Sequence, residues 1–215
     1  MQLSLPHEPG RNCPLCPRLA AFRESHRTAS PDWHNAPVPG FGGLDARLLV
    51  AGLAPGLRGA NRTGRPFTGD GAGDLLYATL LEFGFAEGIY RRDPADGLRL
   101  RDCRIVNAVR CVPPQNKPTG AEITACRPFL QAELRLMPRL RAILCLGRIS
   151  HETLLRTLGL RLADFPFAHG ARHALPDGPL LFDSYHCSRY NTSTRRLTPA
   201  MFREVFEAVR EVTHP

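Results

Sequence analysis

Long hydrophobic runs are absent from this chain of 215 residues. The longest purely apolar run covers residues 142–146. It is far shorter than the roughly 20 residues that an α-helix needs to cross a bilayer. Residues 1–10 lack the basic and apolar regions of a secretory signal. These absences exclude a membrane-spanning helix and predict a protein of the cytoplasm in a prokaryotic-type cell, without a membrane partner.

Lysine is nearly absent as well. Lys117 is the only lysine among 28 basic residues, and these outweigh 20 acidic residues to give a net charge of +8. A basic balance favours polyanionic partners, although a solvated arginine surface or a bias of the genome explains it about as well. Repeats, low-complexity segments and a second domain are not found. With 43% hydrophobic residues, we expect one globular domain over residues 1–215, beginning with a loose arm at residues 1–11.

Disulfide pairing is not expected, because seven cysteines are an odd number and the predicted compartment is reducing. Cys13 and Cys16 form a C-x-x-C pair, which is typical of a metal or cluster site but does not fill a tetrahedral one. Cys111 and Cys126 are the candidates that would complete a set of four thiolates. Such a set suits zinc or an iron–sulfur cluster, and the spacing does not choose between them. We interpret the other cysteines as small buried hydrophobic residues: Cys103, Cys145 and Cys187.

Four apolar runs read as buried strands, and each is followed by a predicted helix. We expect the strands at residues 47–52, 104–109, 141–146 and 179–183. The alternation predicts an α/β fold with a parallel sheet. Residues suited to helix N-caps precede the helices: Asp70, Thr119 with Glu122, Ser150, and Thr198 before Pro199. Ligand loops of parallel sheets gather at the carboxyl edge, so the loops after the first, second and fourth strands should converge.

The loop after the first strand, residues 52–70, is long and rich in glycine. A loop of this length is usually functional or disordered. Its glycines allow a close approach of backbone to ligand, and Arg58, Arg62 and Arg65 offer planar forks suited to phosphate. Phe67 adds an aromatic face. Asp70 is the only carboxylate of the loop, so it could cap the next helix or face a ligand.

Polar residues also mark the ends of two other strands. Asn107 lies near the end of the second strand, where an amide is costly to bury unless it is satisfied. Its donor and acceptor could instead pair with the edge of a base. The fourth strand is followed by a polar loop at residues 184–192, which contains His186.

Four stretches of the chain resemble the motifs of the uracil-DNA glycosylase superfamily. They are residues 52–56, residues 61–70, residues 107–117 and residues 186–191. The resemblance spans about residues 13–210 and is strongest to the iron–sulfur branch called family 5, or the B type. The sister family 4 carries Glu at the position of Leu53. Leu53 cannot orient a water or accept a proton, which points to the B type and shifts that role to Asp70.

The resemblance implies a three-layer α/β/α sandwich with a central four-stranded parallel sheet. It implies a monofunctional glycosylase that removes uracil, and also hypoxanthine or other deaminated bases, from DNA and leaves an abasic site. We expect such an enzyme to act as a monomer. The resemblance also implies a [4Fe–4S] cluster with a structural role, held by Cys13, Cys16, Cys111 and Cys126.

Roles for individual residues follow from the same resemblance. Asp70 would orient the attacking water or stabilise the sugar cation, and His186 would stabilise the departing base anion, as would backbone N–H groups from Gly52 to Ala54. Phe67 would stack on the flipped base and Asn107 would bind its Watson–Crick edge. Arg189 and Tyr190 would enter the groove and fill the gap in the base stack. Arg58, Arg62 and Ser188 would bind phosphate groups of the DNA.

Plainer interpretations stay open at this point. Phe67 could be a core aromatic, Asn107 a structural amide and Asp70 a helix cap only. The whole chain could be a non-catalytic iron–sulfur module for DNA binding or redox chemistry, which Leu53 favours and which Asp70, Asn107 and His186 together disfavour. A zinc-bound nucleic-acid-binding protein is the third hypothesis. Colour separates it from the others, because a [4Fe–4S] protein absorbs near ~400 nm and zinc thiolates do not.

Overall fold

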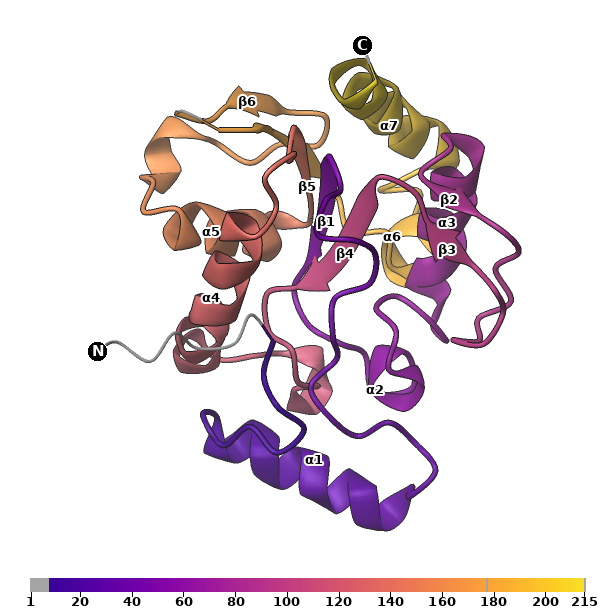
Figure 1. Cartoon of the computed structure of the whole chain (residues 1–215), viewed down its shortest axis with the longest axis vertical. Helices are drawn as coiled ribbons and strands as arrows, with labels where there is room; N and C mark the ends of the chain where they lie inside the picture. Colours follow the sequence, from indigo (N-terminus) through magenta and orange to yellow (C-terminus); the bar gives the residue numbers. More distant parts are fainter. Residues whose placement is uncertain (1–7, 177, 215) are drawn as a thin grey trace.

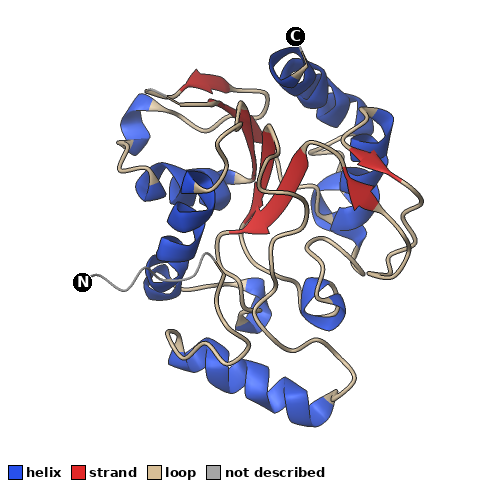
Figure 2. Cartoon of the chain, in the orientation of Figure 1, coloured by secondary structure: helices blue, strands red, loops and turns tan. Residues whose placement is uncertain are grey.

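The computed structural model describes residues 8–176 and 178–214. They form three layers, a central sheet with helices on each of its two faces (Figures 1 and 2). The sheet has five strands in the order β4-β1-β5-β7-β6. They are β1 (Leu48–Gly52), β4 (Cys103–Asn107), β5 (Ala142–Leu146), β6 (Arg172–Ala174) and β7 (Leu180–Ser184). Neighbours among β4, β1, β5 and β7 pair in parallel, and β6 pairs with β7 antiparallel.

The predicted α/β class and the four parallel strands are therefore confirmed, and the strand count is corrected from four to five. The additional strand is β6, in a segment where the sequence predicts no strand. Arg172 and Ala174 are exposed and His173 is half-buried, so this short segment carries no apolar pattern. Its strand character comes from pairing with β7, which the local sequence does not encode.

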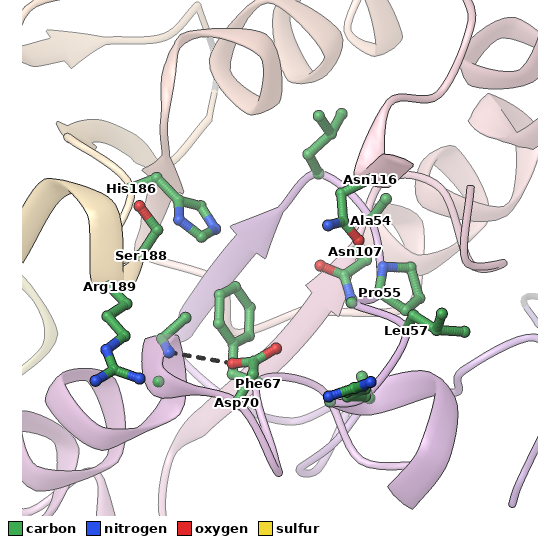
Figure 3. A pocket seen from close by; sticks show the side chains of 17 residues that line it. Ala54, Pro55, Leu57, Phe67, Asp70, Asn107, Asn116, His186, Ser188 and Arg189 are labelled. Carbon is green, nitrogen blue, oxygen red and sulfur yellow. Dashed lines mark hydrogen bonds between the residues drawn. The ribbon is translucent and has the colours of Figure 1, made fainter. Parts of the chain in front are cut away.

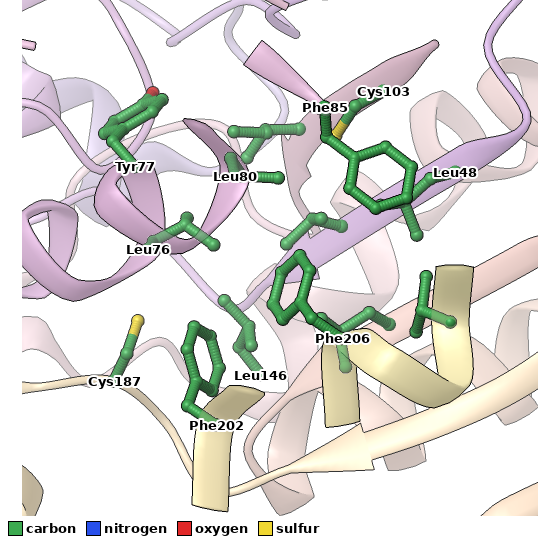
Figure 4. Close-up of a cluster of buried hydrophobic side chains, with 14 of the residues drawn as sticks. Leu48, Leu76, Tyr77, Leu80, Phe85, Cys103, Leu146, Cys187, Phe202 and Phe206 are labelled. Carbon is green, nitrogen blue, oxygen red and sulfur yellow. The ribbon is translucent and has the colours of Figure 1, made fainter. Parts of the chain in front are cut away.

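Both faces of the sheet are covered by helices. Alternate residues of β1 point to opposite faces: Leu48 and Val50 join one apolar cluster, and Leu49 and Ala51 join the other. The first cluster packs α3 (Gly71–Glu82) and α7 (Pro199–Thr213) on the sheet (Figure 4). The second cluster includes residues of α4 (Gly120–Arg135) and α5 (Arg148–Thr157). Burial on both faces explains why the parallel strands read as continuous apolar runs.

Three of the predicted helix caps are present. Asp70 Oδ1 accepts the N–H of Ala72 at 3.1 Å, and Thr119 forms a capping box with Glu122 at the start of α4. Thr198 accepts the N–H of Met201, with proline in the first turn of α7. These caps need only local sequence, which is why they could be predicted.

The cap assigned to Ser150 is wrong. Helix α5 begins at Arg148, directly after Gly147, so Ser150 lies inside the helix. Its hydroxyl donates to the carbonyl oxygen of Ala51 at 2.7 Å. Ser150 therefore ties α5 to β1 across the layer, which is a tertiary contact that a capping pattern does not reveal.

The remaining elements are short or peripheral. They are α1 (Pro17–Ala29), α2 (Ala60–Thr63), β2 (Ala86–Glu87), β3 (Arg99–Leu100), η1 (Pro114–Asn116), η2 (Leu162–Asp164) and α6 (Arg189–Ser193). Helix α1 lies below the sheet in the view of Figure 1. Residues 1–7 of the expected loose arm lie outside the described residues, and Glu8 is anchored by accepting the N–H of Gly40 at 2.7 Å. Among the described residues, no helix is both long and apolar enough to cross a membrane.

Candidate active site

A cavity of about 620 Å³ opens at the carboxyl edge of the sheet (Figure 3). Its wall comes from the loop after β1, the start of α3, the end of β4, η1 and the loop after β7. The lining residues include Leu53, Ala54, Arg58, Phe67, Asp70, Asn107, Asn116, His186, Ser188 and Arg189. The expected convergence of the loops after the first, second and fourth strands is confirmed. It follows from parallel topology, because parallel strands all end at the same edge.

Phe67 reaches the cavity from a strained backbone. Its φ of +51° is rare for a residue with a side chain and costs on the order of 1–3 kcal/mol. Two tyrosine hydroxyls hold the segment in place: Tyr90 donates to the carbonyl oxygen of Phe67 at 3.2 Å, and Tyr77 donates to that of Pro66 at 2.6 Å. The ring lies 5.9 Å from the ring of His186, centroid to centroid. The fold therefore presents an aromatic face and an imidazole in one cavity.

Gly52, at the end of β1, makes this packing possible. A Cβ at this position would collide with Asn107 Oδ1 and would lie 2.7 Å from Phe67 Cζ. Gly52 is not among the lining residues, so its contribution is to let Asn107 and Phe67 approach each other. Ala54, two residues further along the loop, does line the cavity.

The two oxygens of Asp70 face different surroundings. Oδ1 caps α3, whereas Oδ2 has no hydrogen-bond partner among residues 8–176 and 178–214. Figure 3 shows the carboxylate at the cavity, with the hydrogen bond that it accepts from the N–H of Ala72 drawn as a dashed line. The loop packs tightly against it, since a Cβ on Gly56 would lie 2.9 Å from Oδ2 and one on Gly59 would collide with it. The helix-cap role and a free carboxylate oxygen therefore coexist in one side chain.

Asn107 is 3% exposed, and within the described part of the chain its amide makes no hydrogen bond. A ligand in the cavity with a matching donor and acceptor can pair with both ends of this amide. The side chain faces the cavity (Figure 3), which disfavours the interpretation of Asn107 as a satisfied structural amide.

The ring of His186 likewise makes no hydrogen bond to the described residues. Burial lowers the pKa of His186, and the negative charge of Asp70 opposes this effect only in part. The imidazole is therefore neutral near pH 7, with one N–H donor and one acceptor. Asn191 donates to the carbonyl oxygen of His186 at 2.8 Å and fixes the backbone of this loop. Sequence reasoning missed this contact of Asn191.

The basic and polar candidates for DNA contacts differ in position. Arg58, Ser188 and Arg189 line the cavity, whereas Arg62 lies on α2 outside its wall. Ser188 Oγ caps α6 by accepting the N–H of Asn191 at 3.4 Å. Tyr190 follows on α6 with 73% of its surface exposed. The structure thus brings most of these residues to the mouth of the cavity and leaves Arg62 beside it.

The interpretation of Arg65 as a phosphate-binding fork is wrong. Its guanidinium donates twice to the carboxylate of Asp96, at 2.8 Å each. It also lies 5.3–5.8 Å from the ring centroids of Phe41, Tyr77 and Tyr90. The hydrogen bonds from Arg65 lower the pKa of Asp96, against the opposing effect of burial. Arg65 is 5% exposed and supports the loop from inside the fold.

Asn116 lines the cavity and was not predicted as a site residue. It lies in η1 with φ of +58°, between the two prolines Pro114 and Pro118. The signal that could have found it is the rigid, proline-bounded loop after the second strand. Such a loop at a carboxyl edge holds its polar side chains in place.

The four candidate thiols lie close together in the fold. Cys13, Cys16, Cys111 and Cys126 pack in one cluster with Leu19, Val109 and Phe129, and all four are free of disulfides. Within the described ranges, no set of three His, Cys, Asp or Glu side chains is arranged to hold a single metal ion.

Nitrogen donors surround these sulfurs. Arg23 Nη1 donates to Cys111 Sγ at 3.4 Å, and the backbone N–H of Arg110 donates to Cys126 Sγ at 3.4 Å. Among the described residues, Arg23 Nε and Arg110 Nη1 are buried without a hydrogen-bond partner. Apolar packing, N–H donors to sulfur and the positive charge of Arg23 fit a sulfur-rich anionic group.

Comparison with known proteins gives consistent results. The family model of the "Uracil DNA glycosylase superfamily" matches residues 39–210. A protein of Thermus thermophilus named Type-5 uracil-DNA glycosylase is 50% identical over 199 residues, which cover 90% of this chain and 90% of the relative. A relative of the same name from Mycobacterium leprae is 44% identical and covers 93% of this chain and 91% of its own length. One from Pyrobaculum aerophilum is 38% identical, with 90% of this chain and 86% of the relative covered.

Proposed function

The chain belongs to the uracil DNA glycosylase superfamily, and from that premise we propose how its cavity acts. The protein is a monofunctional DNA repair glycosylase. It hydrolyses the N-glycosidic bond of uracil in DNA and leaves an abasic site. The observation that carries the proposal is the meeting of Phe67, Asp70, Asn107 and His186 around one cavity. Asp70 Oδ2, the amide of Asn107 and the ring of His186 make no hydrogen bond to the described residues.

Recognition begins with base flipping, which costs a few kcal/mol of unstacking and unpairing. Phe67 supplies an aromatic face for the extruded base, and the hydrogen bonds from Tyr77 and Tyr90 hold its backbone in place beforehand. The free donor and acceptor of Asn107 pair with the Watson–Crick edge of uracil. Ala54 forms part of the wall and its backbone can approach the base closely, because neither it nor Gly52 carries a large side chain.

Cleavage of the bond places positive charge on the sugar and negative charge on the departing base. The neutral His186 donates an N–H to that anion without needing to be protonated, and backbone N–H groups near Gly52 to Ala54 add to this stabilisation. Asp70 Oδ2 orients the attacking water and stabilises the sugar cation. Leu53 also lines the cavity, but it has no group that could do either, so Asp70 carries both roles.

The mouth of the cavity would hold the DNA backbone. Arg58 and Arg189 line it and make no ion pair with the described carboxylates; Arg62 and Ser188 extend the contact to neighbouring phosphates. Tyr190 is exposed on α6 and is suited to fill the gap that the flipped base leaves in the stack. We also propose that hypoxanthine and other deaminated bases are substrates, and that the enzyme works as a monomer where the chromosome of a prokaryotic cell lies, in the cytoplasm.

We further propose that Cys13, Cys16, Cys111 and Cys126 hold a [4Fe–4S] cluster. Its contribution is structural, since it would join the segment before α1 to α4 and to the loop after β4. The purified protein should absorb near ~400 nm. Replacing Cys13 by Ala should remove the colour and the bound iron, whereas the same replacement of the buried Cys103 should keep both. A colourless protein with bound zinc would contradict the cluster and leave the proposed activity untouched.

A cleavage assay tests the proposed activity. The substrate is an end-labelled duplex with one uracil opposite guanine, and alkali then cuts at abasic sites. We expect wild type to cut and Asp70→Asn to be slower by at least about 100-fold. Asn is also a good N-cap, so the thermal midpoint of the variant should stay close to that of wild type. Equal cutting by both proteins would disprove the role of Asp70. If neither uracil nor hypoxanthine is removed while DNA is still bound, the non-catalytic module is the better hypothesis.

A further inference from the structure

A row of stacked arginine and aromatic side chains lies beside the cavity and has no role in the mechanism above. Arg148 Cζ lies 5.2 Å from the ring centroid of Phe167, and Arg196 Cζ lies 4.8 Å from that of Tyr185. The two rings are 6.4 Å apart, centroid to centroid. We call Arg148, Phe167, Tyr185 and Arg196 the arginine–aromatic row. It places one guanidinium group at each end of a pair of rings.

The row is supported from inside the protein. The ring of His169 stacks on that of Tyr185 at 5.0 Å with 17° between the planes. His169 Nδ1 accepts the backbone N–H of Tyr185 at 3.2 Å, which fixes the imidazole relative to the strand end. Burial lowers the pKa of His169, against smaller effects that raise it, so this support is uncharged near pH 7. The two rings are half-buried and do not need to be ordered by a ligand.

Both guanidinium groups are exposed and free of carboxylates. Neither Arg148 nor Arg196 forms an ion pair with a described acidic side chain, in contrast to Arg65. An arginine that stacks on a ring keeps its N–H donors in the plane of the guanidinium, pointing away from the ring. Two exposed cations therefore lie against aromatic rings with donors that no described carboxylate uses.

The row lies at the rim of the cavity: chain neighbours of its members reach the cavity, although none of its four residues lines it. Tyr185 directly precedes His186, and Arg148 follows Gly147, where a Cβ would lie 3.5 Å from the Cβ of His186. At the other end, Arg196 follows α6, the short helix that carries Arg189 and Tyr190.

We propose that the arginine–aromatic row is a binding site for backbone phosphates of DNA next to the flipped nucleotide. This inference rests on the proposed function, because it takes the ligand of the neighbouring cavity to be DNA. Arg148 and Arg196 each bind a phosphate through their free donors, and Phe167 and Tyr185 hold them in position beforehand. Preordered side chains lose less conformational freedom on binding than free ones do.

Salt dependence measures phosphate contacts directly. For duplex DNA, the slope of log K against log salt changes by roughly 0.9 for each phosphate that a protein neutralises. The probe is a labelled duplex with one stable abasic-site analogue, and binding is followed by fluorescence anisotropy at several salt concentrations. We expect Arg148→Ala and Arg196→Ala each to reduce the slope by about 1 and the double variant by about 2.

A matched control comes from the opposite edge of the sheet. Arg139 is exposed, forms no ion pair with the described carboxylates and lies before β5, so Arg139→Ala removes the same charge far from the rim. Its slope should equal that of wild type. If Arg148→Ala and Arg196→Ala leave the slope unchanged, or reduce it no more than Arg139→Ala does, the proposed site is wrong.

Two further variants separate positioning from charge alone. Phe167→Leu keeps both arginines and should keep the slope, but it should weaken binding several-fold because Arg148 is no longer held. Arg148→Lys should behave in the same way, since lysine lacks the planar fork. Unchanged affinity in both would overturn the role of the rings.

Failure of this inference is distinguishable from failure of the proposed function. If wild type removes uracil while the slopes of the row variants match wild type, the row is wrong and the glycosylase stands. If wild type removes no base but the slopes fall as expected, the row is a DNA site and the proposed chemistry is wrong.

Discussion

Two groups of polar side chains lie inside this protein, and they differ in whether they pair with one another. In the interior, Glu133 bridges Arg104 and Arg110, and His151 pairs with Asp183. Around the cavity, the amide of Asn107 and the ring of His186 make no hydrogen bond to the described residues. Burying a polar group is unfavourable unless it is hydrogen-bonded. The paired groups are therefore explained by the fold, and the unpaired ones call for a ligand.

The loop after β1 shows the same contrast within a few residues. Arg65 is buried against Asp96 and three rings, whereas Arg58 is exposed at the cavity. The residue type alone does not distinguish these two arginines. The difference teaches that a charged residue in a functional loop acquires its role from the partner that the fold supplies.

Removing the centre of the interior network should have the largest effect on stability. Glu133 is 0% exposed and accepts from both Arg104 and Arg110. Glu133→Ala would leave two buried guanidinium groups without their shared carboxylate, at a cost of about 3–5 kcal/mol in the free energy of unfolding. At roughly 2–4 °C for each kcal/mol in a chain of this size, the thermal midpoint should fall by about 6–20 °C.

Thermal denaturation followed by circular dichroism checks this, with Glu207→Ala as the control. Glu207 is exposed on α7 and forms no ion pair with the described residues, so its removal should change the midpoint little. At a temperature where Glu133→Ala is still folded, excision of uracil should stay close to wild type. A small shift in the midpoint of Glu133→Ala would show that the buried network is not a main source of stability.

Removing an unpaired group at the cavity should have the opposite pattern. Asn107→Ala should slow uracil excision by about 10–100-fold, the range that one bidentate base contact supplies. The thermal midpoint should change little, because the amide makes no hydrogen bond to the described residues that the change would break. Single-turnover assays and denaturation on the same samples give both quantities.

A paired asparagine provides the matched control. Asn61 is also buried, but its Nδ2 donates to Asn35 Oδ1 at 2.9 Å. Asn61→Ala should lower the midpoint, since it leaves Asn35 without this donor, and should not weaken recognition of the base. If Asn107→Ala destabilises the fold as much as Asn61→Ala does, Asn107 is a structural amide after all.

The smallest expected effect is a change in how the thermal midpoint depends on pH. His151 Nδ1 lies 2.8 Å from Asp183 Oδ1, and its Nε2 lies 2.9 Å from the carbonyl oxygen of Phe165. Burial opposes a charge on His151, but the hydrogen bond to Asp183 and its negative charge outweigh this and raise the pKa. His173, 3.5 Å from the same carboxylate, and Glu152 also face this group.

Because the pKa of His151 is raised in the folded state, its pairing with Asp183 stabilises the protein more at low pH than at high pH. The stabilisation is complete below the unfolded pKa of about 6.5, and it is lost as the pH rises through the higher folded value. The thermal midpoint of wild type should therefore fall between pH 6 and pH 9 by more than that of His151→Gln, whose side chain does not titrate. Parallel curves for the two proteins would show that the pair does not titrate in this range.

Much of the fold could be predicted because its signals are local. The apolar runs of β1, β4, β5 and β7 and the caps at Asp70, Thr119 and Thr198 depend on neighbouring residues only. Strand β6 could not be predicted in this way, since its pairing with β7 is what makes it a strand. The segment before α1 and the loops around the cavity likewise take their shape from contacts distant in sequence.

The sequence by itself determined the chemistry that is available and the edge of the sheet where it collects. A parallel α/β pattern sends the loops after β1, β4 and β7 to one side, so Phe67, Asp70, Asn107 and His186 had to be neighbours. Which polar groups form hydrogen bonds or ion pairs inside the protein depends on the three-dimensional fold. It buried Arg65 against Asp96, turned Ser150 toward β1, and set Arg148 and Arg196 on aromatic rings at the rim. The reason is physical: a side chain's type fixes which bonds it can make, and its surroundings in space fix which bonds remain to be made.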